Sequence, residues 1–225
     1  MNFEKFKGLI HESWWNKLRP FIESKECDNI YLFLKKQSER GKRIAPLSSN
    51  TFRAFKETSY DDVKVVIIGM APYHSFKDGV PIADGLALSC SITSRLQPSL
   101  EQFYAGISNE LRETRFVKTA DLSYLAHQGV LLLNVALTVE AGKPTSHISL
   151  WKPFTVFLLT EVLDVVGAPV IFLGKDAAMY KKYLMPLTWS YVLDHPAYAE
   201  YSNLPWETEG VFTEVNKILK YRNRI

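Results

Sequence analysis

The chain has 225 residues, 47% of them hydrophobic and 23% charged, a composition typical of globular proteins and unlike that of disordered chains. Its formal net charge of +3 is compatible with a polyanionic partner, although many mildly basic proteins bind no nucleic acid. The two cysteines, Cys27 and Cys90, lie far apart without metal-ligand spacing, so we expect two reduced thiols and no metal site.

The first residues carry charges early and no apolar run comes after them, which argues against a secretory signal. No apolar run approaches the length of a membrane span. We therefore expect a soluble cytoplasmic protein that makes no membrane contact. We also expect a single domain over residues 1–225, with a helical region over 1–60 and a sheet core over 61–225.

The first part of the chain has helical patterns. Residues 3–40 place apolar side chains at helical spacing, and we expect Trp14, Leu32 and Phe33 among those that face the core. The polar residues at 49–51 can cap a short helix that reaches Phe55.

Four apolar segments without polar alternation then predict buried strands. They are Val63–Ile68, Val130–Asn134, Val170–Leu173 and Trp189–Leu193. Helical patterns separate them, around residues 98–115 and 150–166. Fully apolar strands that alternate with helices indicate an α/β fold, here a four-stranded parallel sheet with helices on both faces.

Polar residues come directly after each predicted strand. The four strand ends are Gly69-Met70-Ala71-Pro72-Tyr73-His74, Asn134, Gly174-Lys175 and Asp194-His195-Pro196. Because the carboxyl ends of parallel strands meet at one edge of a sheet, these loops are expected to build one cleft.

The loop at residues 69–74 resembles the active-site loop of the family 1 uracil-DNA glycosylases, whose pattern is Gly-Gln-Asp-Pro-Tyr-His. Further segments are similar to that family and occur in its order. These are Ala83–Ser89, Gln97–Leu100, Gln128–Asn134, Leu137–Val139, Ala141–His147 and the pair His195-Pro196. The block from 128 to 147 is the most distinctive of them, and the whole resemblance covers roughly residues 60–200.

The resemblance implies a single-domain enzyme that flips a deoxyuridine out of DNA and hydrolyses its N-glycosidic bond without a metal or an organic cofactor. It implies that Asn134 binds the Watson–Crick edge of the base and that Tyr73 stands against C5. It also implies that His195 donates to O2 as charge builds on the departing base. Without the resemblance, Asn134 could be a turn residue, His195 a surface imidazole and Tyr73 a packed ring.

The resemblance also implies contacts with DNA phosphates, which position a duplex or a single strand without reading its sequence. The residues expected there are Pro98, Ser99, Ser146, His147 and Lys175. We accordingly expect a monomer that binds DNA and is found where DNA is, in the cytoplasm, the nucleoid or a nucleus.

The chain departs from the family pattern at the catalytic loop. Met70 and Ala71 replace the Gln and the catalytic Asp, and a methyl group cannot activate water. Asp78, in a segment longer than the family's, and Asp84 are the nearby carboxylates, of which Asp84 better suits a structural role. His74 is either a second ionisable group beside the base or a brace for its loop.

Two other departures concern the base and the duplex. Leu88 stands where the family has a Phe that stacks on uracil, so the pocket has less side-chain volume and a weaker stacking surface. The segment 195–200 lacks the family's wedge sequence, and Tyr198 or Tyr201 could replace the wedge.

Two functions are consistent with these observations. The first is a DNA glycosylase that excises uracil or an enlarged modified pyrimidine, with altered rate or target. The second is an impaired or inactive relative that binds DNA or a flipped base as a replication, repair or defence factor. A small-molecule hydrolase ranks last, because it leaves the phosphate loops unused.

Overall fold

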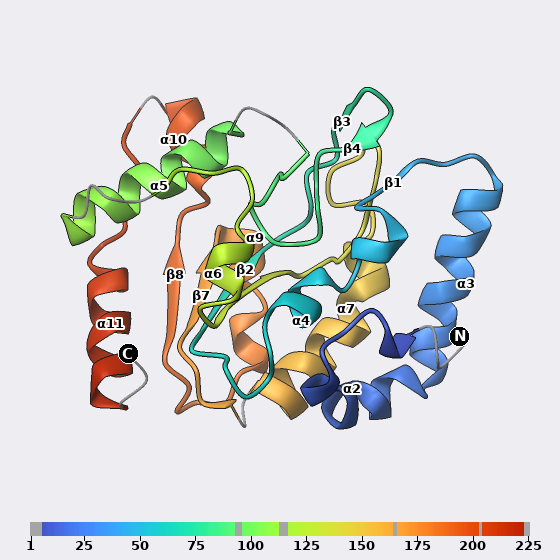
Figure 1. Cartoon of the computed structure of the whole chain (residues 1–225), viewed down its shortest axis with the longest axis horizontal. Coiled ribbons are helices and arrows are strands. Elements are labelled where there is room, and N and C mark those ends of the chain that lie inside the picture. The colour runs from blue at the N-terminus through green and yellow to red at the C-terminus, as the bar shows by residue number, and fades with distance from the viewer. Residues whose placement is uncertain (1–5, 93–95, 113–116, 164–165, 203, 223–225) are drawn as a thin grey trace.

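A four-stranded parallel sheet forms the centre of the molecule (Figure 1). The computed structural model describes residues 6–92, 96–112, 117–163, 166–202 and 204–222. The strands are β2 (Val65–Gly69), β5 (Val130–Asn134), β7 (Val170–Leu173) and β8 (Ser190–Leu193), in the order β5-β2-β7-β8. Every neighbouring pair runs parallel, so all four strands end at the same edge.

The predicted α/β fold is confirmed. All of β2 and β7 is buried, as strands without polar alternation require. The first strand begins two residues later than predicted and includes Gly69, and the last begins at Ser190. The other two strands have the predicted limits.

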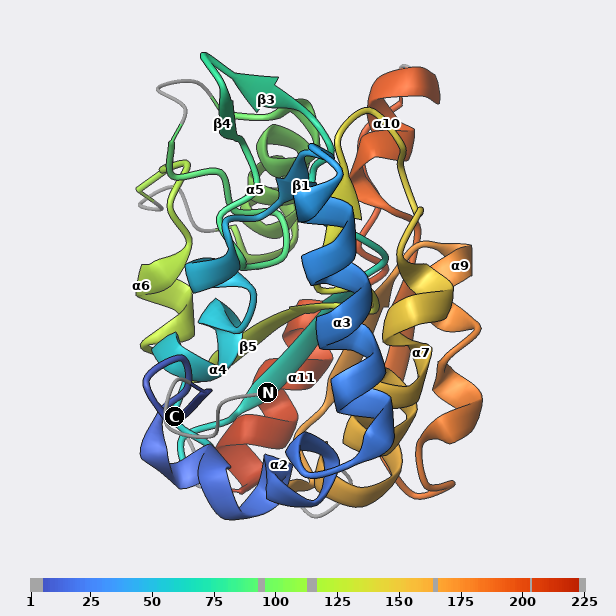
Figure 2. The same ribbon diagram turned by 90° about the vertical axis from the view of Figure 1, so that its right-hand side faces the viewer.

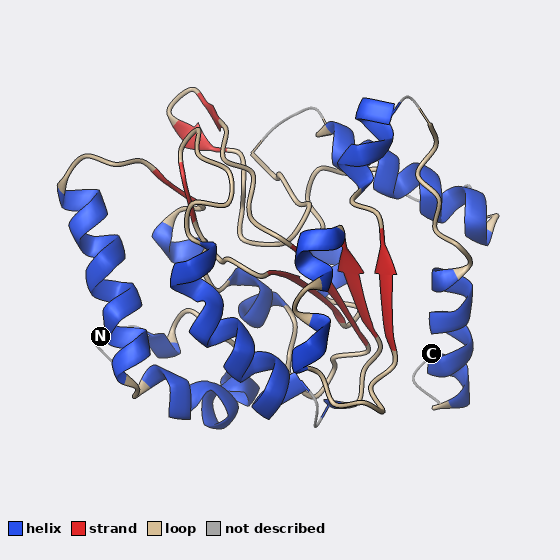
Figure 3. Ribbon diagram, turned by 180° about the vertical axis from the view of Figure 1, so that it is seen from behind, coloured by secondary structure: helices blue, strands red, loops and turns tan. Residues whose placement is uncertain are grey.

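Helices cover both sides of the sheet (Figures 1 and 3). Those of the first half are α2 (Trp15–Ile22), α3 (Lys25–Glu39), α4 (Arg53–Glu57), α5 (Pro98–Leu111) and α6 (Ser123–Ala126). Those of the second half are α7 (Ile148–Phe157), α9 (Lys175–Ala178), α10 (Pro196–Ser202) and α11 (Val211–Tyr221). Short 3-10 turns span Glu12–Trp14, Ser48–Asn50 and Lys181–Tyr183, and a π-helical turn spans Leu158–Leu163. Helices α3 and α7 lie on one side of the sheet, with α5 and α11 on the other.

The predicted helical region over 3–40 is divided in the structure, and residues 3–5 lie outside the described residues. Ser24 separates α2 from α3, because its hydroxyl caps α3 by accepting a hydrogen bond from the Cys27 N–H at 3.2 Å. The expectation that Leu32 and Phe33 face the core is wrong, since these side chains are 58% and 39% exposed. Helix α3 packs through the stripe that holds Cys27 and Ile30, which leaves its other side uncovered.

The later helices also differ at their ends. Helix α5 begins at Pro98 as predicted and ends at Leu111, because Arg112 adopts a left-handed conformation with φ 52°. The last residues of the segments predicted at 98–115 and 150–166 include 113–115 and 164–165, which lie outside the described residues. Helix α7 begins at Ile148, two residues before the predicted start.

Two small antiparallel sheets stand above the main sheet, and sequence patterns did not predict them. Strand β1 (Ile44–Ala45) pairs with β6 (Val139–Glu140). Strand β3 (Phe76–Lys77) pairs with β4 (Val80–Pro81) to form a hairpin. Figures 1 and 2 show these strands grouped at the end of the molecule where the main strands terminate.

One cluster of buried side chains extends from Phe6 to Leu219 and links the N-terminal helices to the sheet. Both cysteines are buried, and burial raises the pKa of the Cys27 thiol to about 11. Among the described residues, no helix combines the length and the apolar character needed to cross a membrane.

Candidate active site

A cavity of about 490 Å³ opens at the carboxyl ends of the strands. The loop after β2 lines it from Gly69 to His74, while β5 contributes Asn134 and the end of β8 contributes His195. The segment 83–88 and the start of α5 form the remaining walls. The structure thus brings together the ends of three strands, whereas Lys175 after β7 is not part of the lining.

Asn134 and Gly69 face each other across neighbouring strands. They are register partners at the ends of β5 and β2, and a Cβ added to Gly69 would meet Asn134 Oδ1 at 2.7 Å. The glycine therefore makes room for the amide group. Within the described residues, the Asn134 amide makes no hydrogen bond, so its donor and its acceptor remain available to a ligand.

His195 has a defined tautomer. The backbone N–H of Ala197 donates to His195 Nδ1 at 3.1 Å, so the neutral ring carries its proton on Nε2. Burial lowers the pKa of His195 and favours this neutral form near pH 7. His195 can therefore donate a hydrogen bond into the cavity without introducing a full charge.

Tyr73 is held by its hydroxyl group. The hydroxyl donates to the Leu88 carbonyl at 3.2 Å and lies 2.6 Å from Ser99 Oγ. Since the Tyr73 proton is used on Leu88, Ser99 donates to Tyr73 in this arrangement. Burial raises the pKa of Tyr73, which keeps the phenol neutral. The ring is thereby fixed in one wall of the cavity.

Leu88 adopts a left-handed conformation with φ 65°, which is unusual for leucine. The buried Asp84 carboxylate supports this turn by accepting from the backbone N–H groups of Leu86 at 3.2 Å and Ser91 at 2.9 Å. Arg53 pairs with the same carboxylate at 2.9 Å. Asp84 thus has the structural role that its sequence position favoured, and Ala83 rather than Asp84 lines the cavity.

No carboxylate belongs to the described residues that line the cavity. Ala71 offers only a methyl group. Asp78 lies exposed in the turn between β3 and β4 with φ 50°, because residues 75–83 form a hairpin that carries it away from the lining. The geometry gives the expected catalytic role of Asp78 no support. Among the described residues, no cluster of three or more His, Cys, Asp or Glu could hold a metal ion.

His74 lines the cavity and is half-buried. Its carbonyl accepts the N–H of Gly142 at 3.1 Å, which ties the β2 loop to the loop after β6. In the described part of the chain its imidazole makes no hydrogen bond. The backbone of His74 braces the loop, and its ring remains available to a ligand or to water.

The residues expected to bind phosphates fall into two groups. Pro98, Ser146 and Lys175 are exposed, and Ser146 Oγ accepts the Glu140 N–H at 2.9 Å. Ser99 and His147, in contrast, are buried to 4% and 3% exposure. His147 Nδ1 lies 2.9 Å from Thr138 Oγ1, so its side chain supports the loop from within.

Pro144, Thr145, Ala197 and Tyr201 also line the cavity, although the sequence gave none of them a role in binding the base. Pro144 and Thr145 come from the loop after β6, where Thr145 has φ 65°. Ala197 and Tyr201 come from α10, and Tyr201 is 83% exposed at the rim. Only the aromatic character of Tyr201 gave a signal in the sequence.

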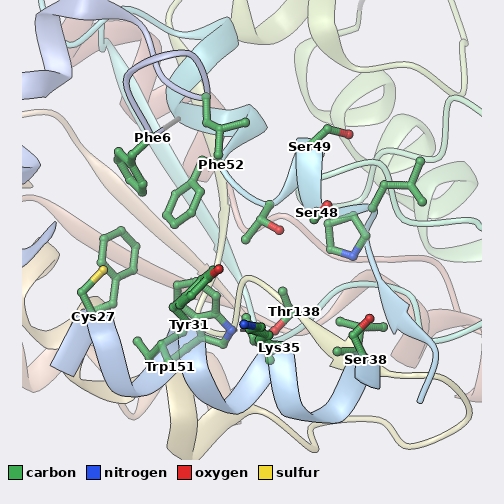
Figure 4. A pocket seen from close by; sticks show the side chains of 18 of the residues that line it. Phe6, Cys27, Tyr31, Lys35, Ser38, Ser48, Ser49, Phe52, Thr138 and Trp151 are labelled. Atoms are coloured by element: carbon green, nitrogen blue, oxygen red, sulfur yellow. Dashed lines mark hydrogen bonds between the residues drawn. The ribbon is translucent and has the colours of Figure 1, made fainter. Parts of the chain in front are cut away.

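A second cavity, of about 840 Å³, lies away from the strand ends between α3 and the segment that leads to α4 (Figure 4). Phe6, Phe52 and Trp151 are among its walls, and Ser38, Ser48 and Lys35 are among its polar residues. Its lining is mainly aromatic and aliphatic. The smaller cavity holds Asn134 and His195, which offer the hydrogen-bond donors and the acceptor that recognition of a base requires. We therefore assign the candidate active site to the smaller cavity.

An amide and a neutral imidazole at the strand ends of a parallel sheet, around one cavity, are the groups that a DNA glycosylase of the α/β class needs to hold a flipped base. A family model described as the Uracil DNA glycosylase superfamily matches residues 55–220. The uracil-DNA glycosylase of Acinetobacter baumannii (strain AYE) is 39% identical over 177 residues, which are 78% of this chain and 72% of that protein. That of Francisella tularensis subsp. tularensis (strain WY96-3418) is 37% identical over 187 residues, 80% of each chain. The chain belongs to the uracil-DNA glycosylase superfamily.

Solved structures share the fold. The uracil-DNA glycosylase of mimivirus has a TM-score of 0.81 at 22% sequence identity, over 96% of this chain and 85% of that chain. The UNG of Nitratifractor salsuginis has a TM-score of 0.62 at 20% identity, over 87% and 90% of the two chains. At such identities the likeness concerns the arrangement of strands and helices.

Proposed function

We propose that the protein is a DNA glycosylase that binds a flipped uracil in the cavity at the strand ends and hydrolyses its N-glycosidic bond, leaving an abasic site. It acts as a monomer on DNA. One observation carries the proposal: Asn134 and His195 line the same cavity, and the Asn134 amide and His195 Nε2 make no hydrogen bond within the described residues.

The Asn134 amide matches the edge of uracil. Its Oδ1 accepts a hydrogen bond from N3–H, and its Nδ2 donates to O4. His195 Nε2–H donates to O2, where negative charge develops as the base leaves. A neutral donor suits this role because it strengthens its hydrogen bond as the charge grows.

The position of Tyr73 favours uracil as the substrate over pyrimidines that carry a substituent at C5. Its ring cannot turn aside without breaking the hydrogen bonds of its hydroxyl to Leu88 and Ser99. Leu88 and Ala71 leave space elsewhere in the cavity, which is the observation that favours an enlarged pyrimidine as a second substrate. In either case Leu88 contacts the base without the stacking of an aromatic ring.

Hydrolysis in this cavity proceeds without a carboxylate base. The departing base is stabilised by His195, and the sugar develops oxocarbenium character that DNA phosphates can offset. Among the ionisable groups that line the cavity, His195 Nδ1 accepts the Ala197 N–H. The ring of His74, in contrast, makes no hydrogen bond within the described residues. His74 is therefore the group that orients water and accepts its proton in this proposal.

The N-terminus of α5 and the loop at 141–147 would bind phosphates beside the cavity. At the start of α5, Pro98 has no N–H and the Leu100 N–H donates to the Gln97 carbonyl at 2.8 Å, so the Ser99 N–H is the donor offered to an anion, which the helix dipole also favours. The hydroxyl of Ser146 is exposed and can donate to a phosphate oxygen. Ser99 and His147 act from within, by holding Tyr73 and Thr138.

The experiment is a time course on oligonucleotides, single-stranded and duplex, that contain uracil, 5-hydroxymethyluracil or glycosylated hydroxymethylcytosine. We expect release of uracil, with alkali-labile sites at the uracil position, and loss of release in Asn134→Ala. Tight binding of uracil DNA without release of any base would instead favour the non-catalytic alternative suggested by Ala71. No release and no preference for modified DNA would reject the proposal.

A further inference from the structure

The hairpin of β3 and β4 directly follows the β2 loop that lines the cavity, although residues 76–81 are not themselves part of the lining. Its turn residues, Asp78 and Gly79, have φ values of 50° and 83°, the pattern of a two-residue type I′ turn. Lys77 pairs with Val80, and the Ile82 N–H donates to the Ser75 carbonyl at 3.1 Å. Such turns match the natural twist of the strands, so the tip has a defined position.

The hairpin is also anchored to its surroundings. Phe76 packs with Tyr73 against a small buried cluster made of Ala45, Ala83 and Val139. The guanidinium of Arg43 lies 4.1 Å from the centre of the Phe76 ring. Arg43 is held in turn by the loop after β6, because its carbonyl accepts the Ala141 N–H at 2.8 Å.

Four cations lie along this hairpin and the neighbouring strands β1 and β6, and we call them the basic ledge. They are Lys42, Arg43, Lys77 and Lys143. Lys42 and Lys143 share the Glu140 carboxylate at 3.0 and 2.9 Å, and both keep exposed side chains. Arg43 and Lys77 are exposed and have no ion-pair partner among the described residues.

The basic ledge adjoins the proposed base pocket. Gly142 donates to the His74 carbonyl, and Pro144 and Thr145 of the same loop line the cavity. Figures 1 and 2 show β1, β3 and β4 together on one side of the strand ends, with α10 on the other. A strand whose base enters the cavity would therefore have its neighbouring phosphates within the field of the ledge.

We propose that the basic ledge binds the DNA backbone beside the flipped nucleotide, an interaction that rests on the proposed function and extends its surface. Arg43 is the stronger anchor, because Phe76 fixes the plane of its guanidinium and leaves N–H groups for two phosphate oxygens. Lys77 adds a point charge near the hairpin tip. These contacts select DNA over a free nucleoside without reading its sequence.

The test compares Arg43→Ala and Lys77→Ala with the wild type on two uracil substrates, a long oligonucleotide and a trinucleotide with uracil in the middle. On the long substrate each variant should raise KM and Kd roughly two- to fivefold, since exposed ion pairs are worth little individually. The slope of log Kd against log salt should fall by roughly 0.7–0.9 for each lost phosphate contact. The trinucleotide carries only the two phosphates that flank the uracil, so its kcat/KM should fall less in each variant than that of the long substrate.

Three further variants separate charge from folding. Lys77→Glu should weaken binding of the long substrate more than Lys77→Ala, while Arg43→Lys should keep the salt slope. Lys220→Ala, on exposed α11 at the opposite end of the molecule, removes one charge as a matched control and should leave binding unchanged (Figure 1). Melting temperatures identify any variant that is merely unfolded.

The outcomes distinguish this inference from the function on which it rests. If the wild type releases uracil but both alanine variants keep the wild-type salt slope, the ledge has no role and the glycosylase proposal stands. If no base is released, Kd values on uracil-containing DNA still test the ledge by the same comparison. An equal loss in Lys220→Ala would show a general charge effect and would overturn the inference.

Discussion

The ends of β2 and β8 lie at the same edge of one sheet, yet they offer different chemistry. After β8, His195 has a fixed tautomer, a lowered pKa and a hydrogen-bond donor for the cavity. After β2, Ala71 offers a methyl group, and the hydroxyl of Tyr73 is already bonded to Leu88 and Ser99. In the proposed mechanism the first loop supplies the donor to the departing base, whereas the second offers only a methyl group at Ala71, where the family has its catalytic Asp.

This contrast indicates which half of the reaction the site serves. Hydrolysis of an N-glycosidic bond needs stabilisation of the departing base and delivery of water to the sugar. In the proposed mechanism the β8 loop stabilises the departing base through His195, while the β2 loop delivers water only through His74. Activation of water should therefore limit the rate, while stabilisation of the departing base is already in place.

The largest effect should come from restoring a carboxylate to the β2 loop. Ala71→Asp should raise kcat for uracil release by roughly 10²–10⁴, the usual contribution of a positioned general base. Single-turnover kinetics on a uracil duplex measure it. Ala71→Asn has nearly the same shape without basicity and should give no such gain; equal rates for the two variants would show that water activation does not limit the reaction.

Removing His195, the proposed donor to the departing base, should have the next largest effect. His195→Ala deletes the donor to O2, and kcat should fall roughly 10²–10³-fold, as for loss of one oxyanion donor, with little change in Kd. His195→Gln keeps an amide donor and should recover part of the rate. A kcat within a few-fold of wild type in His195→Ala would mean that His195 does not stabilise the departing base.

Much of the contrast between the two loops was predictable from the sequence, because it depends on buried strands and on the polar residues at their carboxyl ends. Runs of β-branched residues located the sheet, and the polar residue after each run located the edge of the site. Asn134 was predictable for the same reason: it ends a strand whose register is set by its apolar face. The family resemblance then suggested roles that a lone Asn or His could not.

The surroundings of the site were less predictable, because they depend on contacts between distant segments. The hairpin at 76–81 has only two residues in each strand, too few for a periodic pattern, and its position settles where Asp78 lies. The exposure of Leu32 depends on how much of α3 its neighbours cover. Tyr201 reaches the cavity rim only because α10 packs on α5.

A smaller effect should come from disturbing the position of His195 without removing it. Gly174 has φ 91° and ψ 155°, and an added Cβ would lie 3.2 Å from His195 Cβ. Gly174→Ala should cost about 1–3 kcal/mol of stability through backbone strain. The displaced ring should also lower kcat roughly tenfold. Gly210→Ala is the matched control, because its φ is 76° and its surroundings are open; equal kcat values in the two variants would contradict the positioning argument.

The smallest effect concerns stability in acid. Burial lowers the pKa of His195 and of His147 in the folded state, whereas an unfolded histidine titrates near 6.5. The unfolded chain therefore binds protons more readily, so this contribution to stability is complete above about pH 6.5 and is lost as the pH falls. His195→Gln removes one such group, and its melting temperature should decline less steeply than that of the wild type between pH 7.5 and 5.5. Gly210→Ala, destabilised without a change in titratable groups, should show the wild-type slope. A parallel decline in His195→Gln would mean that His195 is protonated as easily in the folded protein as in the unfolded chain. The proposal of a neutral donor at His195 would then lose its support.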